Sequence, residues 1–319
     1  MPKGIFVQSA CVLLRETVAV EEVERALYAF EIIRRTDRGP TWVVGGPGLL
    51  VKYRPQVNGL VLIDMVERPW PDLMGHPQTD PMLIQGWSMG QFGPCVFPAA
   101  LERASQQSWV WQAGKEVAAQ HQAFLRIRCS YALGAEKDAP LIAADADSVD
   151  ELEHLTGIAQ ALLSLPQAIC LFNPNGEVLR DLKGVEESIQ FADQHEVLPL
   201  DLWSNIRLFN VNQDWLMMDT VGNPQLDLPD VEAIFTRKYE PGQIDGFLRD
   251  TTFYLHNNGR NVIKNGHTMD GPGGVDWQAH HYEHGISDPP RSVLTWLPND
   301  GTPPPEELKD RKQIEPTET

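Results

Sequence analysis

The stretch 215–231 constrains the fold of this chain more than any other segment. It opens with a run of apolar residues that ends at Asp219, passes through a glycine and continues as Leu-Pro-Asp-Val-Glu. The apolar run predicts a strand and the glycine a turn. Asp230 is a suitable N-cap and Glu232 suits the positive end of a helix, so a helix is expected over 229–235. A strand that leads polar residues into a turn and a helix start is either a site or an ordinary connection.

Length and element order predict an α+β protein. A chain of 319 residues of which 42% are hydrophobic is large enough for two domains or one large composite domain. Strand and helix patterns alternate without a regular βαβ rhythm, which favours mixed, mostly antiparallel sheets with flanking helices. We therefore expect an N-terminal domain over 1–120 that includes a long connector (66–100), a C-terminal domain over 121–298, and a flexible, Pro-rich and charged tail over 299–319.

Hydrophobic periodicity and capping residues predict the individual elements. Segment 123–131 alternates apolar and charged residues, which indicates a strand with one face in solvent. The connector is dense in Pro, Gly, Met and Trp, so we expect an irregular segment whose aromatic side chains are covered by the domain core or by a neighbouring subunit. Expected strands are 5–14, 59–66, 123–131, 168–172, 200–209, 215–221 and 290–297; expected helices are 21–34, 98–120, 147–165, 185–195, 229–235 and 243–256.

The charge distribution argues for a protein partner and against nucleic acid. The formal net charge is −18, and phosphate binding requires lysine and arginine. Segment 140–201 alone carries twelve acidic residues against Arg180 and Lys183, a net of −10. Such a segment is either a solvated surface or a face for a basic partner. The candidate partner-binding residues are Asp145, Asp147, Asp150, Glu151, Glu153, Glu186, Glu187, Asp193, Asp227 and Asp230.

Cysteine spacing and hydropathy indicate the compartment. Cys11, Cys95, Cys129 and Cys170 are far apart and match neither a zinc-ligand spacing nor a disulfide framework. They are typical of buried thiols in a reduced compartment. The chain has no apolar run long enough to span a bilayer and no recognisable signal peptide. We therefore expect a cytoplasmic protein with no membrane association and no cofactor.

The sequence His280-His-Tyr-Glu-His284 is the strongest metal-like cluster. On a helix, His280 and His284 would share a face at i and i+4, but the glutamate does not occupy the position it has in the His-Glu-x-x-His motif. The chain has no Gly-x-Ser-x-Gly sequence, and its cysteines have no nucleophile setting. We expect no catalytic residues, no bound metal and no enzyme activity. A metal-dependent enzyme that uses 280–284 is the alternative.

The second half of the chain resembles an uncharacterised bacterial family, number 4261 among the domains of unknown function. The resemblance covers about 200–298 and rests on Trp-Ser-Asn-Ile-Arg-Leu-Phe from Trp203, Trp-Leu-Met-Met-Asp-Thr-Val-Gly from Trp215, Leu-Pro-Asp-Val-Glu-Ala from Leu228, Tyr-Leu-His-Asn-Asn-Gly from Tyr254, Gly-His-Thr from Gly266, and Pro-Arg-Ser-Val-Leu from Pro290. That family supplies no catalytic residues.

The chain as a whole is also similar to immunity proteins that guard bacteria against nuclease toxins of type VI secretion systems. This resemblance implies a homodimer that neutralises a basic effector toxin by stoichiometric association. A scaffold or accessory component of a secretion system, docking through the connector, is a further alternative.

Overall fold

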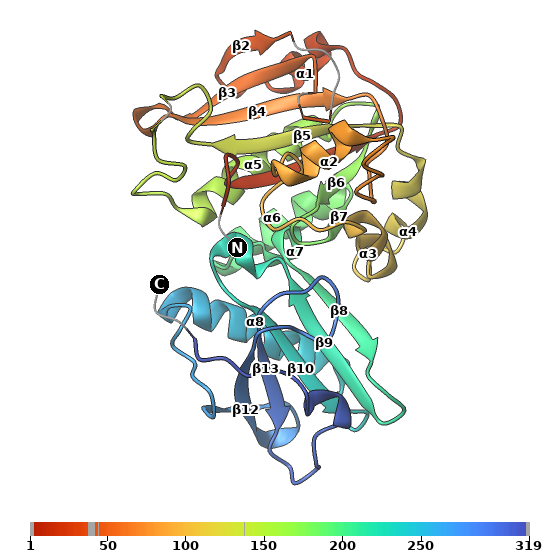
Figure 1. Ribbon diagram of the computed structural model, residues 1–319, viewed down its shortest axis with the longest axis vertical. Coiled ribbons are helices and arrows are strands. Elements are labelled where there is room, and N and C mark those ends of the chain that lie inside the picture. Colours follow the sequence, from red (N-terminus) through yellow and green to blue (C-terminus); the bar gives the residue numbers. More distant parts are fainter. Residues whose placement is uncertain (1–2, 38–41, 44, 137, 317–319) are drawn as a thin grey trace. The chain divides into compact units, whose positions relative to one another are not determined.

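The computed structural model describes residues 3–37, 42–43, 45–136 and 138–316, and the chain divides into two compact units, Met1–Trp203 and Ser204–Thr319 (Figure 1). Each unit has its own largely antiparallel sheet and its own helices, so the predicted α+β class is confirmed. The boundary differs from the expected one at residue 120. The reason is that β5 (Ala123–Ser130) pairs with strands on both sides within the first sheet and therefore belongs to the first unit.

The first unit is built on a seven-stranded sheet in which every pairing is antiparallel, in the order β2-β3-β4-β5-β1-β6-β7. Besides β5, its strands are β1 (Gln8–Leu14), β2 (Ile32–Thr36), β3 (Gly48–Arg54), β4 (Gly59–Val66), β6 (Ala168–Asn173) and β7 (Val178–Arg180). Its helices are α1 (Val20–Ala26), α2 (Pro81–Ser88), α3 (Ala100–Gln106), α4 (Gly114–Val117), α5 (Ser148–Leu162), α6 (Leu182–His195) and α7 (Leu200–Trp203), with short 3₁₀ turns at Pro55–Val57 and Ala118–Gln120.

Both faces of this sheet are covered. Helix α5 packs on β1 and β5. The connector contributes Trp70 and Phe92 to a core cluster on the sheet, and the Trp70 ring makes edge contacts with Phe124 of β5 and Phe172 of β6 at centroid distances of 5.4 and 5.0 Å. The unit's own core therefore covers these connector aromatics, and the connector is less irregular than expected because it contains α2.

The prediction that one face of β5 lies in solvent is wrong. All eight residues of this strand are buried, and Arg126 and Arg128 are each 1% exposed. These arginines bond to the connector, since both donate to the carbonyl oxygen of Gln91. Alternation of charged and apolar residues indicates two different faces, but it does not say that the charged face meets water.

The second unit carries a six-stranded sheet in the order β11-β12-β13-β10-β9-β8, in which the β10–β13 pair is parallel and the others are antiparallel. Helix α8 packs on β9 and β10 (Figure 1). The elements are β8 (Asn205–Asn210), β9 (Trp215–Val221), β10 (Asp230–Thr236), α8 (Pro241–Asn258), β11 (Thr268–Gly271), β12 (Val275–Tyr282) and β13 (Val293–Pro298), with 3₁₀ turns at Asn223–Leu226, Pro272–Gly274 and Glu306–Leu308.

The predicted helix over 229–235 is wrong, because this segment forms strand β10. It pairs with β9 through Glu232 opposite Asp219 and with β13 through Glu232 opposite Thr295. Because it lies inside the sheet, the backbone of the segment is held by strand pairing. The carboxylates of Asp230 and Glu232, which suggested a helix N-terminus, instead accept hydrogen bonds from buried side chains.

The expected flexible tail is also wrong for residues 299–316. Leu308 is buried in a core cluster with Trp215 and Met217, and Tyr282 forms a β-bridge with Gln313. Burial of apolar side chains and a backbone pairing hold this segment on the unit although its composition is polar and Pro-rich. Residues 317–319 lie outside the described part of the chain.

Several other elements differ from the predicted ones mainly in where they begin and end. Segment 21–34 divides into α1 and β2, segment 98–120 into α3, α4 and a 3₁₀ turn, and segment 200–209 into α7 and β8. The capping prediction for α5 is confirmed: Asp147 accepts hydrogen bonds from the backbone N–H groups of Val149 and Asp150 at 2.9 and 3.3 Å. Within the described residues, no helix is both long and apolar enough to cross a bilayer.

Candidate functional site

The stretch 215–231 supplies carboxylates to a buried charge network, here called the Asp219 network (Asp219, Asp230, Arg207 and Arg291). Arg207 of β8 lies opposite Asp219 and donates from Nε and Nη2 to its two oxygens at 3.0 and 2.7 Å. Arg291 donates from Nη2 to Asp219 at 2.7 Å and from Nε to Asp230 at 2.8 Å. Ser287 also donates to Asp219. Two guanidinium groups thus neutralise two carboxylates in the protein interior.

The two carboxylates of this network have opposite pKa shifts. Burial raises the pKa of Asp219, but Arg207 and Arg291 outweigh it and the net pKa is lowered. At Asp230 burial dominates and raises the pKa, although Arg291, the backbone N–H of Asn223 and the hydroxyl of Thr220 act against it. The expected role of Asp230 as a helix cap or partner-binding residue is wrong, because its side chain is 0% exposed and occupied by these contacts.

The C-terminal segment completes a second buried ion pair. Glu232 accepts a hydrogen bond from Thr295 at 2.7 Å and lies 2.6 Å from Nη1 of Arg311. The carboxylate is 0% exposed, so Arg311 provides its charge compensation. The acidic residues around Asp219 are therefore paired with arginines in the interior of the second unit.

The i, i+4 helical geometry that a metal site at His280 and His284 would require does not form. Residues up to Tyr282 belong to β12, where neighbouring side chains point to opposite faces. The ring of His281 bonds to the carbonyl oxygen of Ile263 at 3.0 Å, and Glu283 forms an exposed ion pair with Lys312. Among the described residues, no group of three or more His, Cys, Asp or Glu side chains is placed to hold a metal ion.

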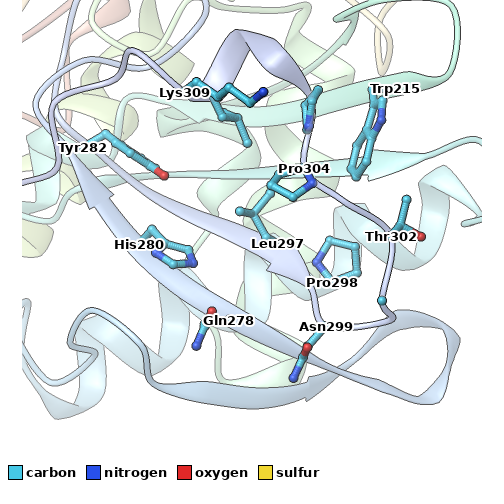
Figure 2. A pocket seen from close by; sticks show the side chains of 13 residues that line it. Trp215, Gln278, His280, Tyr282, Leu297, Pro298, Asn299, Thr302, Pro304 and Lys309 are labelled. Atoms are coloured by element: carbon cyan, nitrogen blue, oxygen red, sulfur yellow. The ribbon is translucent and has the colours of Figure 1, made fainter.

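A pocket of about 460 Å³ lies beside His280 in the second unit (Figure 2). Gln278, His280 and Tyr282 line one side because they alternate along β12, and Trp215 and the segment after β13 line the other. Burial, with a smaller contribution from the neighbouring His281, lowers the pKa of His280, which favours the neutral ring. The lining is a mixture of proline, aromatic and neutral polar groups with Lys309 at its edge.

Several of the predicted partner-binding residues are used internally. Glu151 is 1% exposed and accepts a hydrogen bond from the Tyr131 hydroxyl at 2.8 Å. Asp145 forms an ion pair with Arg54, although its side chain remains 61% exposed. Asp150 accepts a hydrogen bond from the Tyr53 hydroxyl at 2.6 Å. Glu151 cannot reach a partner, whereas Asp145 and Asp150 border the surface.

The remaining candidates of the first unit form an exposed group on two helices, here called the acidic helix face (Asp147, Glu153, Glu186, Glu187 and Asp193). Asp147 and Glu153 belong to α5 and its cap, and the other three to α6. Partial burial raises the pKa of Glu153, and the negative charges of Asp150, Asp147 and Asp193 raise it further. The two helices thus contribute to one negative field. Asp227 is exposed in the second unit, in a turn.

Two features of the first unit were not anticipated. Phe191 is 59% exposed on α6, one turn after Glu187. A buried cluster, the Asp64 cluster (Asp64, Arg126 and Arg128), lies between β4 and β5 beside a second pocket. The signal for the cluster was present in the sequence as charged residues inside apolar strands, but pairing Asp64 with Arg126 requires the strand register.

Comparison with known proteins gives one match. Residues 219–297 match the model of a domain of unknown function (DUF4261). The matched segment lies in the second unit, from Asp219 in β9 to Leu297 in β13, and contains both carboxylates of the Asp219 network together with Arg291. No curated protein and no solved structure matches the chain.

Proposed function

We propose that this protein is an immunity protein, which binds a cognate type VI secretion effector toxin, a basic nuclease, and neutralises it by stoichiometric association. The observation that carries the proposal is the acidic helix face. Its carboxylates lie on the surface of α5 and α6, and partial burial, followed by repulsion from the neighbouring carboxylates, raises the pKa of Glu153. A basic partner relieves this repulsion and is steered toward the face over a distance of about one Debye length.

An exposed aromatic side chain supports a binding role for the same surface. Phe191 lies among the acidic positions of α6, and its ring contacts the ring of His195 at 4.3 Å between centroids. Protein interfaces typically place an aromatic anchor at the centre of a polar, charged rim. We assign Phe191 to the anchor and Glu186, Glu187 and Asp193 to the rim.

Sequence resemblance supports the class of partner. The chain as a whole resembles TsiT, the immunity protein of Pseudomonas for the type VI secretion nuclease toxin TseT. A nuclease that grips phosphates is expected to be basic, so a protein of net charge −18 is electrostatically complementary to it. On this proposal the protein acts in the cytoplasm, without cofactor, and is not an enzyme.

The proposal predicts that a toxin-like nuclease is encoded next to this gene, and it is tested by association kinetics with that nuclease after purification. We expect the association rate constant to fall by about ten-fold or more between low and high salt. Replacing Glu153→Gln, Glu186→Gln and Asp193→Asn together should lower the low-salt rate by a similar factor, because three steering charges are removed. Phe191→Ala should instead raise the dissociation rate.

The matched control removes three exposed carboxylates elsewhere in the same unit: Glu16→Gln, Glu67→Gln and Glu116→Gln. It changes the net charge by the same amount and should leave the association rate within about two-fold, since steering depends on where the charges lie. Equal rates at both salt concentrations, or an equal loss in the control, would contradict the proposal.

We further propose that the protein forms a homodimer through the connector. Leu73, Met74, Met82 and Met89 of this segment are between 44% and 73% exposed. Exposed apolar side chains that gather in one segment are typical of association surfaces. Sedimentation velocity should give twice the monomer mass, and Leu73→Lys with Met82→Lys should restore the monomer mass; a wild-type monomer at all concentrations contradicts the dimer.

A further inference from the structure

The Asp64 cluster contains one more positive charge than negative charge. Asp64, Arg126 and Arg128 are each 1% exposed. Arg126 satisfies the carboxylate by itself, because its Nε and Nη2 donate to the two oxygens of Asp64 at 3.1 and 2.5 Å, and the backbone N–H of Gly45 adds a third bond at 2.8 Å. Arg128 reaches the same carboxylate through Nη2 alone, at 2.9 Å. A buried surplus charge is costly unless a counter-charge is supplied.

The second guanidinium has an incompletely used donor edge. Its Nη1 donates to the backbone and side-chain oxygens of Gln91 and its Nη2 lies against Asp64, but its Nε has no hydrogen-bond partner among the described residues. Nε and Nη2 lie on the same side of a guanidinium, and this edge binds carboxylate or phosphate oxygens in pairs. Burial, followed by repulsion from Arg126, lowers the pKa of Arg128 to about 9, as expected for a charge without full compensation.

A pocket of about 680 Å³ adjoins this arginine within the first unit. Arg128, Asp64 and Gln91 line it together with apolar side chains such as Phe6, over whose ring the Arg128 guanidinium lies at 4.2 Å. Arg34 and Arg35 of β2 also line it and are exposed. The volume is that of a small-molecule site.

We propose that this pocket binds a small organic anion, whose carboxylate or phosphate group accepts a hydrogen bond from Nε of Arg128 and shares its Nη2 with Asp64. The Gln91 side chain, which lines the pocket and contacts Nη1, rotates to admit the anion, and Arg34 attracts it at the rim. The site is separate from the acidic helix face, so it holds or fails independently of the proposed toxin binding.

The test is a titration of the full chain, without toxin, with citrate as a carboxylate probe and inorganic phosphate as a phosphate probe. At constant ionic strength, we expect one or both to raise the melting temperature saturably, by about 2 °C or more at full occupancy. Sodium chloride and glycerol should not. The probe that acts identifies which oxyanion the site prefers.

Variants decide whether the effect belongs to this pocket. Arg128→Met should abolish the saturable shift and Arg34→Glu should weaken the affinity at least three-fold, whereas Arg260→Glu, at an exposed arginine of the second unit, should change nothing. If Arg128→Met does not fold, the comparison of Arg34→Glu with Arg260→Glu shows whether the anion binds in this pocket. Absence of a saturable shift in the wild type overturns the proposal, and so does a shift that Arg128→Met or, failing that variant, Arg34→Glu leaves unchanged.

Discussion

Replacing Asp219 with Asn is expected to lower the free energy of unfolding by about 3–5 kcal/mol, the usual loss when one partner of a buried ion pair is removed. The carboxylate accepts bonds from Arg207, Arg291 and Ser287 and is 0% exposed. An amide offers one acceptor oxygen and no charge, so two guanidinium groups lose their shared counter-charge in the protein interior. The variant tests whether this carboxylate is structural.

Hydrogen exchange is the suitable measurement, because it reports the stability of each unit separately. We expect faster exchange throughout β8, β9 and β10, with little change in the sheet of the first unit. Asp276→Asn is the matched control: it makes the same chemical change at an exposed residue of β12 and should cost less than about 0.5 kcal/mol. Equal stability of the two variants would show that the Asp219 network contributes nothing to folding.

The second large effect is expected at Asp64. Asp64→Asn leaves Arg126 and Arg128 as two buried cations without a counter-charge, and should cost about 3–5 kcal/mol. Arg128→Met alone keeps the balanced pair of Asp64 and Arg126. It should therefore cost less than Asp64→Asn, about 1.5–3 kcal/mol, the size of lost hydrogen bonds that involve a charged group, here to Gln91 and Asp64.

The double variant distinguishes a surplus charge from an ordinary ion pair. In the Asp64→Asn background, Arg128→Met removes one of the two uncompensated cations and should recover about 1 kcal/mol or more, measured by urea unfolding. If Arg128 were an essential partner of Asp64, Arg128→Met alone would cost as much as Asp64→Asn. That result would also remove the charge argument for the anion pocket.

Local patterns predicted many elements of this protein correctly. The strands at β1, β4 and β9 follow from compact apolar runs, and β5 follows from the alternation of apolar and charged residues. Helix α5 follows from an apolar stripe that begins after the capping residue Asp147. In each case the determining interactions lie within the element or its first turn. The α+β class follows from the order of such elements and requires no knowledge of distant contacts.

The wrong predictions for the charged residues of β5 and β10 share one cause. Asp230 and Glu232 were interpreted as residues of a helix start, and Arg126 as a residue on a wet strand face, because each was assigned to the nearest environment that favours a charge. All three are buried against partners far away in the chain: Arg291 lies 61 residues after Asp230, and Arg126 lies 62 residues after Asp64. Local periodicity carries no information about such pairs.

The surface that we propose for toxin binding was only partly predictable. Its acidic character follows from the composition of 140–201, but the sequence does not separate Glu151, which is buried against Tyr131, from Glu153 two residues later, which is exposed. Phe191 has the same apolar character as a core residue. Its exposure depends on which side of α6 packs on the unit.

The sequence by itself determined the two-sheet α+β character, the excess of acid and the positions of the strongest helices and strands, because these depend on short-range periodicity and on composition. Tertiary structure alone decided which charges are solvated. Segments that look like linkers, the connector 66–100 and the stretch 299–316, cover sheet faces and enclose Arg126, Asp64 and Glu232. Burial of a charge is stable only when a distant opposite charge arrives with it, so the role of each carboxylate is set by contacts that only folding creates.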